Sequence, residues 1–187
     1  MKKQPEITER TRENLIAAFW KIYCKKRIER ISVKEITTIA GYNRGTFYEY
    51  FTDVYDVLEQ LENSLLPTMD KLPPTTSASE AEQVRAVFQM YEKNSKYYVV
   101  LLGDNGDPAF QSKIKNCIKP MLIQMFDGKS DLPMAELDYA IEYMLSAMLG
   151  VLGYWYRQEK PLPPEQLIPL MNDLSHNKIS GKLLKKQ

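Results

Sequence analysis

The stretch Ser32–Phe51, SVKEITTIAGYNRGTFYEYF, carries the start and stop signals of two short helices in close succession. Ser32 followed by Glu35 forms a capping box, in which each side chain bonds the backbone N–H of the other residue. Gly41 stands where a residue in the left-handed conformation ends a helix. Asn43 then offers a side-chain oxygen that caps the next helix. We therefore predict two helices joined by a tight turn at Gly41.

Apolar residues at helical spacing extend this pattern on both sides. The first helix is predicted to begin near Thr8, and Thr52 or Asp53 is expected to cap a fourth helix. Phe47 and Phe51, at spacing i, i+4, are expected to point into a shared core. The expected inner faces comprise Leu15, Ala18, Phe19, Ile22 and Tyr23 in the first helix, Val33, Ile36, Ile39 and Ala40 in the second, and Val54, Val57 or Leu58, Leu61 and Leu65 in the fourth.

Charge is unevenly distributed along the 187 residues. Residues 1–51 hold 11 Lys and Arg against 6 Asp and Glu, a net charge of +5, whereas the whole chain has a net charge of +1. A basic amino-terminal segment on a mildly acidic remainder indicates that the first part meets a polyanion. Together with the paired helices, this favours a helix-turn-helix that binds double-stranded DNA.

A helix in the major groove requires small residues near phosphates, hydroxyls that fix its register, and a long donor for base edges. Arg44 is expected to reach guanine O6 and N7 from the start of the recognition helix, and such a contact discriminates by about 1–3 kcal/mol. Lys34 is expected to meet a phosphate. The candidate DNA-binding residues are Lys34, Arg44, Gly45, Thr46, Tyr48 and Tyr50.

The remainder of the chain also reads as helical. A composition change at residues 72–79 predicts a connection, and a helix is expected to start at Ser79. The segment KYYVVLL has strand-like composition, but with no partner strand evident we predict a short buried helix. Further helices are predicted from Pro108 to about Phe126, over Leu137–Tyr156, and after PLPPEQ, where Pro169 implies a late start or a kink. The predicted fold is all-α, with domains 1–51 (helix-turn-helix), 52–71 (connecting helix) and 72–187 (helical effector-binding and dimerisation domain).

The residues of the first part resemble the TetR family of bacterial transcriptional regulators. The match covers about residues 8–65 and lies in Phe19, SVKEITTIAG, GYNRGTFYEYF and the helix with Leu58. The resemblance implies that Lys34, Arg44, Thr46, Tyr48 and Tyr50 contact DNA and that Phe47 lies in the core between them. The family often has His at Tyr50 and Lys at Val54, so one phosphate contact is expected to be missing. The phrase LLGDNGDPAFQSKI resembles one in a Gram-positive subset, some members of which are named as dihydroxyacetone kinase regulators.

By the same resemblance, the last two long helices are expected to form the interface of a homodimer. The favoured function is a repressor released from a palindromic operator by a small apolar or aromatic effector. The alternative is an activator or co-regulator whose carboxy-terminal domain binds another protein, and a helical enzyme is a third, disfavoured reading. Aromatic and Met residues of the second part are mostly assigned to the core, so no ligand contact is assigned.

Other site types find little support in the sequence. Asp104, Asn105 and Asp107 lack the spacing of a calcium loop, whose twelfth position would be Lys115 rather than Glu. We expect no metal site, no cofactor and no catalytic residues. Cys24 and Cys117 are expected to be buried thiols in a reducing compartment. With no apolar run of about 18 residues, we predict no membrane span and a cytoplasmic location.

Overall fold

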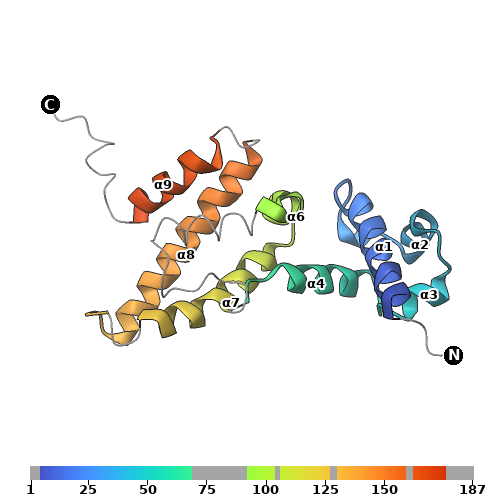
Figure 1. Cartoon of the computed structure of the whole chain (residues 1–187), viewed down its shortest axis with the longest axis horizontal. Helices are drawn as coiled ribbons and strands as arrows, with labels where there is room; N and C mark the ends of the chain where they lie inside the picture. Colours follow the sequence, from blue (N-terminus) through green and yellow to red (C-terminus); the bar gives the residue numbers. More distant parts are fainter. Residues whose placement is uncertain (1–4, 69–91, 104–105, 127–129, 159–161, 176–187) are drawn as a thin grey trace. The chain divides into compact units, whose positions relative to one another are not determined.

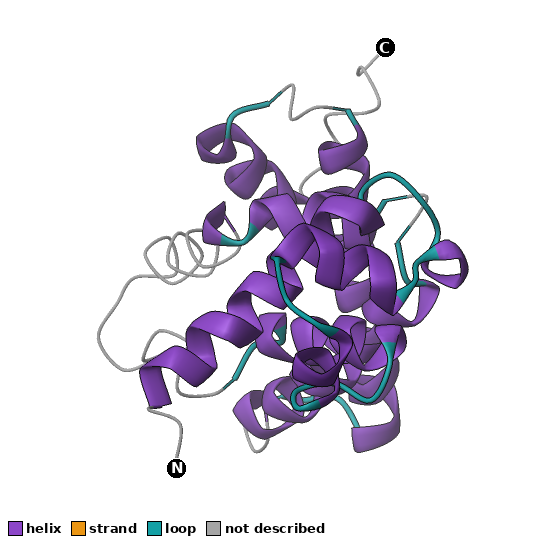
Figure 2. Cartoon of the chain, turned by 90° about the vertical axis from the view of Figure 1, so that its right-hand side faces the viewer, coloured by secondary structure: helices purple, strands orange, loops and turns teal. Residues whose placement is uncertain are grey.

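The computed structural model divides the chain into two compact units, residues 1–65 (the headpiece) and residues 66–187 (the body). All regular elements among the described residues are helices, as predicted (Figure 2). The residues that the structure describes are 5–68, 92–103, 106–126, 130–158 and 162–175. The predicted connection at 72–79, the helix expected from Ser79, and Asp104 and Asn105 lie outside these ranges.

The headpiece contains four α-helices and one 3-10 turn within its described residues. Helix α1 contacts both α2 and α4, and α2 contacts α3 (Figure 1). Because α4 belongs to this unit, the headpiece extends past the recognition helix; the division into domains at 51 and 71 stays a prediction. The elements are α1 (Pro5–Tyr23), η1 (Ile28–Arg30), α2 (Val33–Ala40), α3 (Arg44–Tyr48) and α4 (Val54–Leu65).

The capping signals around α2 and α3 are confirmed. Ser32 Oγ accepts from the N–H of Glu35, and the Glu35 carboxylate accepts from the N–H of Ser32 at 3.0 Å. Gly41 has φ of 75°, and the N–H of Tyr42 donates back to the Thr37 carbonyl at 3.0 Å, which closes the helix end. Asn43 Oδ1 accepts from the N–H of Thr46 at 2.8 Å and so begins α3.

The headpiece core agrees with the predicted inner faces except in α2. Ile39 is 50% exposed, so its expected place in the core is wrong, and Thr37 is buried in its stead. Thr37 tolerates burial because its hydroxyl donates to the carbonyls of Val33 and Lys34, its own helix, at 3.0 and 3.1 Å. The buried apolar side chains include Leu15, Phe19, Ile36, Phe47, Phe51, Val57, Leu58 and Leu61.

Two local expectations in the headpiece need correction. Helix α1 begins at Pro5, earlier than Thr8, because proline suits the first turn of a helix. Cys24 is exposed, since α1 ends one residue before it. Val54 is buried, as predicted for the inner face of the fourth helix, and its neighbour Tyr55 is exposed. The position occupied by Val54 therefore serves the core of the headpiece.

The body contains four helices within its described residues, and each predicted helix that falls in those residues is present. The segment KYYVVLL is helical, and Tyr98 and Leu101 within it are buried. Pro169 lies inside the last helix, which begins before it, so a late start is wrong. No helix within the described ranges is long and apolar enough to cross a membrane. The helices are α6 (Ser95–Leu101), α7 (Pro108–Phe126), α8 (Met134–Arg157) and α9 (Pro164–Ser175).

Helix α8 organises the body and contacts α6, α7 and α9 (Figure 1). Leu137, Ile141 and Leu145 form one core cluster, against which α7 packs. Two ion pairs flank this cluster. Lys115 Nζ lies 2.7 Å from Glu142 Oε1, and Lys119 Nζ lies 2.9 Å from Asp138 Oδ1. The packing of α7 on α8 therefore combines an apolar seam with charge pairing.

A different face of α8 remains exposed. Tyr139 and Tyr143 are each 78% exposed, and Tyr154 follows three turns later on the same side at 59%. Other exposed residues between them are small, among them Ala140, Ala147 and Gly150. We call this set the tyrosine stripe: Tyr139, Ala140, Tyr143, Ala147, Gly150 and Tyr154.

Candidate nucleic-acid interface

The start of α3 presents two of the predicted DNA-binding residues to solvent. Arg44 and Gly45 are both exposed, at the first and second positions of the helix. Lys34 is exposed at the second position of α2, which packs against α3. The guanidinium and the ammonium thus lie on adjoining helices with no core packing to restrain them.

The remaining candidates follow along α3 and just beyond it. Tyr48 is 58% exposed, while Thr46 and Tyr50 are half-buried. Phe47 between them is fully buried, which is the position predicted for it. One side of this short helix is therefore fixed in the core, and the other offers hydroxyls.

Aromatic packing sets the orientation of α3. The ring of Phe47 lies 5.5 Å from that of Phe51 and meets the ring of Tyr48 edge-on at 89°. Aromatic pairs of this kind contribute about 0.5–1.5 kcal/mol beyond area burial. Phe47 is buried and its ring contacts that of Tyr48, so this contact restrains the position of the Tyr48 side chain.

Gly45 serves the cap as well as the surface. A Cβ atom at this position would lie 3.1 Å from Asn43 Oδ1, closer than most such contacts. That oxygen holds the N–H of Thr46, so a larger residue would press on the N-cap. The absence of a side chain also lets backbone approach a phosphate closely.

The Ser32–Glu35 cap is reinforced by a lysine from the preceding loop. Lys26 Nζ lies 2.5 Å from Glu35 Oε1, on the carboxylate that also accepts from Ser32. The hydrogen bond from Lys26 and those from Ser32 lower the pKa of Glu35 to about 2. The carboxylate is therefore charged at neutral pH and favourably placed at the positive end of α2.

Tyr42 is a residue of this surface that the sequence reasoning did not single out. It is half-buried between α2 and α3, and its hydroxyl accepts from Asn14 Nδ2 of α1 at 3.1 Å. Hydrogen bonds from Asn14 and Thr11 lower the pKa of Tyr42. Its partner lies 28 residues away, so no local pattern could have shown that it ties the turn to α1.

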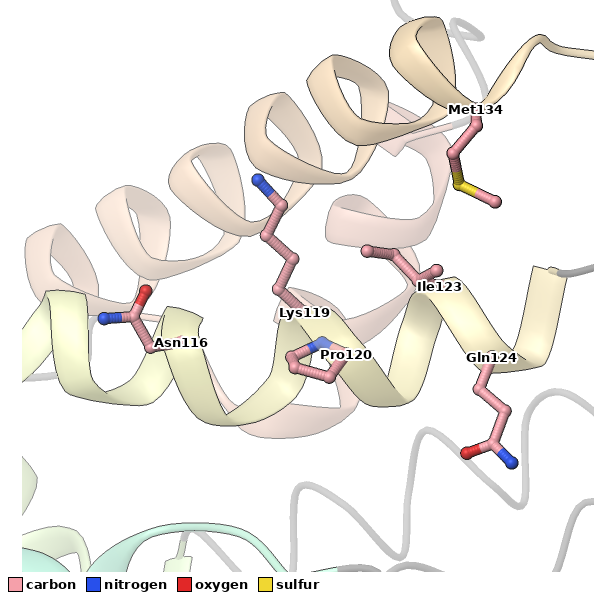
Figure 3. A pocket seen from close by; sticks show the side chains of 6 residues that line it. All are labelled: Asn116, Lys119, Pro120, Ile123, Gln124 and Met134. Carbon is pink, nitrogen blue, oxygen red and sulfur yellow. The ribbon is translucent and has the colours of Figure 1, made fainter.

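The body holds a second candidate site beside α7. A largely open surface pocket of about 530 Å³ is lined by Asn116, Lys119, Pro120, Ile123, Gln124 and Met134. Figure 3 shows Lys119 pointing toward α8 and Ile123 lying below Met134. Proline inside α7 has no N–H, so residue 120 cannot supply the usual helical bond to the carbonyl of Asn116. The lining thus combines apolar side chains with the side-chain amides of Asn116 and Gln124.

None of the six residues that line this pocket is aromatic. Tyr98 and Trp155 are buried in the core, and the indole N–H of Trp155 donates to the Leu162 carbonyl at 2.8 Å. Lys119 is ion-paired with Asp138 at 2.9 Å, and this hydrogen bond raises the pKa of the lysine. A ligand here would meet a charged ammonium group that already has a carboxylate partner.

Comparison with known proteins identifies relatives of this fold. The sequence profile described as "Transcriptional regulator C-terminal region" matches residues 80–177. A TetR transcriptional regulator from Streptococcus agalactiae 2603V has a similar structure, with TM-score 0.68 and 18% identity over 91% of this chain and 96% of that one. Comparison with curated protein sequences returns no match.

Two further solved structures share the fold at the same identity. The fatty acid degradation regulator FadR from Bacillus halodurans has TM-score 0.66 and 18% identity, covering 94% of this chain and 96% of that one. The dihydroxyacetone kinase operon activator DhaS has TM-score 0.59 and 18% identity, covering 94% of this chain and 98% of that one. These likenesses establish the all-helical architecture.

Proposed function

The chain belongs to the TetR family of transcriptional regulators, and from this premise we propose that it is a homodimeric repressor that an effector releases from a palindromic operator. The observation that carries the proposal is the exposed α3 with its buried Phe47. Arg44 and Tyr48 project from a helix that the headpiece core and the Asn43 cap hold in place. A recognition helix in the major groove needs this division between anchored and exposed faces.

The proposed roles differ between Arg44 and Lys34. Arg44 contacts guanine O6 and N7, which gives sequence discrimination of about 1–3 kcal/mol. Lys34 contacts a phosphate, which adds affinity for every sequence. This one contact also steepens the fall of log K with log salt concentration by about 0.9. Thr46, Tyr48 and Tyr50 donate hydroxyls that fix the register of the helix on the duplex.

The tyrosine stripe of α8 supports pairing of two chains. Its tyrosines are among the most exposed large side chains of the described residues, and Ala140, Ala147 and Gly150 permit close helix approach. On α9, Leu170 and Leu174 are also exposed, at 39% and 43%. Exposed apolar surface on two helices that contact one another supports an association site here, and a two-fold pair matches the symmetry of a palindrome.

The cavity beside Pro120 supports an effector site in the body. Its volume of about 530 Å³ falls within the range of roughly 300–1,000 Å³ that small-molecule sites occupy. Pro120, Ile123 and Met134 offer apolar contacts, while Asn116 and Gln124 offer amides. An effector with an apolar or aromatic body and one polar group fits this lining. It would release DNA by binding the DNA-free conformation more tightly.

Selection from a random-sequence DNA pool tests the proposal. The protein is expected to enrich a palindromic duplex, and fluorescence anisotropy then compares variants on that duplex. Arg44→Ala is expected to relax base preference at one position of each half-site. Lys34→Ala is expected to weaken binding to all duplexes and to reduce the salt slope by about 0.9. Lys93→Ala, an exposed lysine of the body, is the matched control. No enrichment at low salt would refute DNA binding.

A second candidate is an activator whose body binds another protein. The similar structure of an operon activator favours this alternative, as does the resemblance of LLGDNGDPAFQSKI to a subset of Gram-positive members. Under this alternative the protein holds its operator with or without small molecules, and a protein partner increases transcription. Reconstituted transcription from the selected duplex separates the two, because the repressor lowers the transcript level on its own.

A further inference from the structure

Gln60 of α4 contacts three separate parts of the headpiece. Its Oε1 accepts from Nε and Nη2 of Arg12 in α1, at 3.2 and 2.9 Å. Its Nε2 donates to the backbone carbonyl of Tyr50 at 3.3 Å and to Asp56 Oδ1 at 3.0 Å. We call Arg12, Asp56 and Gln60 the polar clasp. All three are half-buried, which excludes part of the competing water.

The carbonyl that the polar clasp holds belongs to the turn just after the recognition helix. Helix α3 ends at Tyr48, and Tyr50 follows it by two residues. The carbonyl of Tyr50 lies past the last residue of the helix and takes its donor from another element. Gln60 supplies that donor from a helix that is itself fixed to α1 through Arg12. The end of α3 is thereby tied to two longer helices.

Asp56 extends the polar clasp to the next residues of the chain. Its Oδ2 accepts from the backbone N–H of Thr52 at 2.7 Å, while Oδ1 accepts from Gln60. Burial alone would raise the pKa of Asp56, but the hydrogen bonds from Thr52 and Gln60 outweigh it and the pKa is lowered. The carboxylate therefore remains charged and holds the segment that leaves α3.

The length of α3 makes these ties important. A helix of five residues is far below the length at which helices are stable alone. Its orientation depends on its anchors, which are the Asn43 cap at the start and Phe47 in the middle. Just past its end, Phe51 is buried and the polar clasp holds the carbonyl of Tyr50.

We propose that Gln60 is a positioning residue that sets DNA affinity, without touching DNA, by holding the end of the recognition helix on α4 and α1. This inference rests on the proposed DNA-binding function. It also makes α3 and α4 one mechanical unit, so a displacement of α4 moves the recognition helix with it.

Two variants of equal side-chain length test the role of Gln60. Gln60→Met removes both halves of the contact without adding charge. Gln60→Glu keeps the acceptor for Arg12 but places an oxygen against the Tyr50 carbonyl and Asp56. Each is expected to weaken binding to the selected duplex about tenfold, as loss of a partly buried hydrogen bond predicts. The salt slope is expected to stay unchanged, because no phosphate contact is lost.

Hydrogen exchange separates positioning from general destabilisation. In both variants the amide of Phe51, which donates to the Phe47 carbonyl at the end of α3, is expected to exchange about tenfold faster, while the amide of Ile36 in the headpiece core keeps its rate. Asn63→Asp, an exposed amide-to-carboxylate change on the same helix, is the matched control and should leave both readouts unchanged.

Specific results overturn the inference. Wild-type affinity in Gln60→Met overturns it, as does a loss that is accompanied by equally faster exchange at Ile36. If the wild-type protein binds no duplex from the pool, the proposed function fails, whereas exchange at the Phe51 amide still tests whether Gln60 holds the end of α3.

Discussion

Replacement of Gly41 isolates the cost of a left-handed backbone from the cost of steric overlap. Gly41 has φ of 75°, and a Cβ built there has nothing within 4 Å. An L-residue in this conformation costs roughly 1–2 kcal/mol, and restriction of the unfolded chain by alanine returns about 0.4–1 kcal/mol. Gly41→Ala is therefore expected to destabilise the headpiece by about 1 kcal/mol, which lowers its melting temperature by about 4–8 °C.

The series Gly41→Asn, Gly41→Ala and Gly41→Val should lose stability in that order. Asparagine adopts the left-handed region more readily than alanine, and β-branched valine does so least. The two tryptophans of the chain allow the units to be followed separately, because Trp20 lies in the headpiece and Trp155 in the body. Labelling with 5-fluorotryptophan and recording fluorine NMR against temperature gives one melting curve for each unit.

The predicted order of stability depends only on how readily each residue adopts the left-handed backbone conformation. Gly41→Asn less stable than Gly41→Ala would contradict the reasoning, and so would an unchanged headpiece midpoint in Gly41→Val. The resonance of Trp155 serves as the internal control, since the substitution lies in the other unit.

Two further predictions concern charge and assembly. The pKa of Glu35 lies at about 2, below its ordinary value of 4.5, so its contacts stabilise the headpiece above pH 4.5 and that contribution is lost as pH falls toward 2. Lys26→Ala should raise the carboxyl midpoint in a carbon-13 NMR titration; an unmoved midpoint would exclude Lys26 as the main cause. Tyr143→Glu places a charge in the tyrosine stripe and is expected to yield monomers at micromolar concentration by sedimentation, with helicity retained. Tyr55→Glu, at an exposed headpiece site, should leave the dimer intact, and a dimeric Tyr143→Glu protein would remove the stripe from the interface.

Local chemistry explains why the helix-turn-helix was predictable. Ser32, Gly41 and Asn43 each act within a few residues of their own position, so their roles can be inferred from adjacent sequence. Ile39 shows the limit of the same approach. Helical spacing placed it in the core, but a threonine that satisfies its hydroxyl on its own helix can take the buried position instead. A hydrophobic pattern treats Thr37 as a polar residue, so it misplaces the buried face of α2.

Long-range contacts explain what the sequence did not reveal. Gln60 meets Arg12 across 48 positions, and Tyr42 meets Asn14 across 28. No pattern in the linear sequence shows that one glutamine of an amphipathic helix hydrogen-bonds several separate segments. Pro120 is likewise unremarked in the sequence, since its consequence for the Asn116 carbonyl arises only once α7 is known to continue past it. The candidate DNA-binding residues stay predictions that the geometry favours.

The exposure of Cys24 offers a natural attachment point for a spectroscopic probe. Its thiol lies at the end of α1, whereas Cys117 is half-buried and its Sγ donates to the Pro67 carbonyl at 2.9 Å. Partial burial raises the pKa of Cys24, so nitroxide attachment should proceed best in mildly alkaline buffer. In a two-fold pair, each headpiece would then carry one spin label. Pulsed dipolar spectroscopy would measure the distance between the two labels and so between the two headpieces.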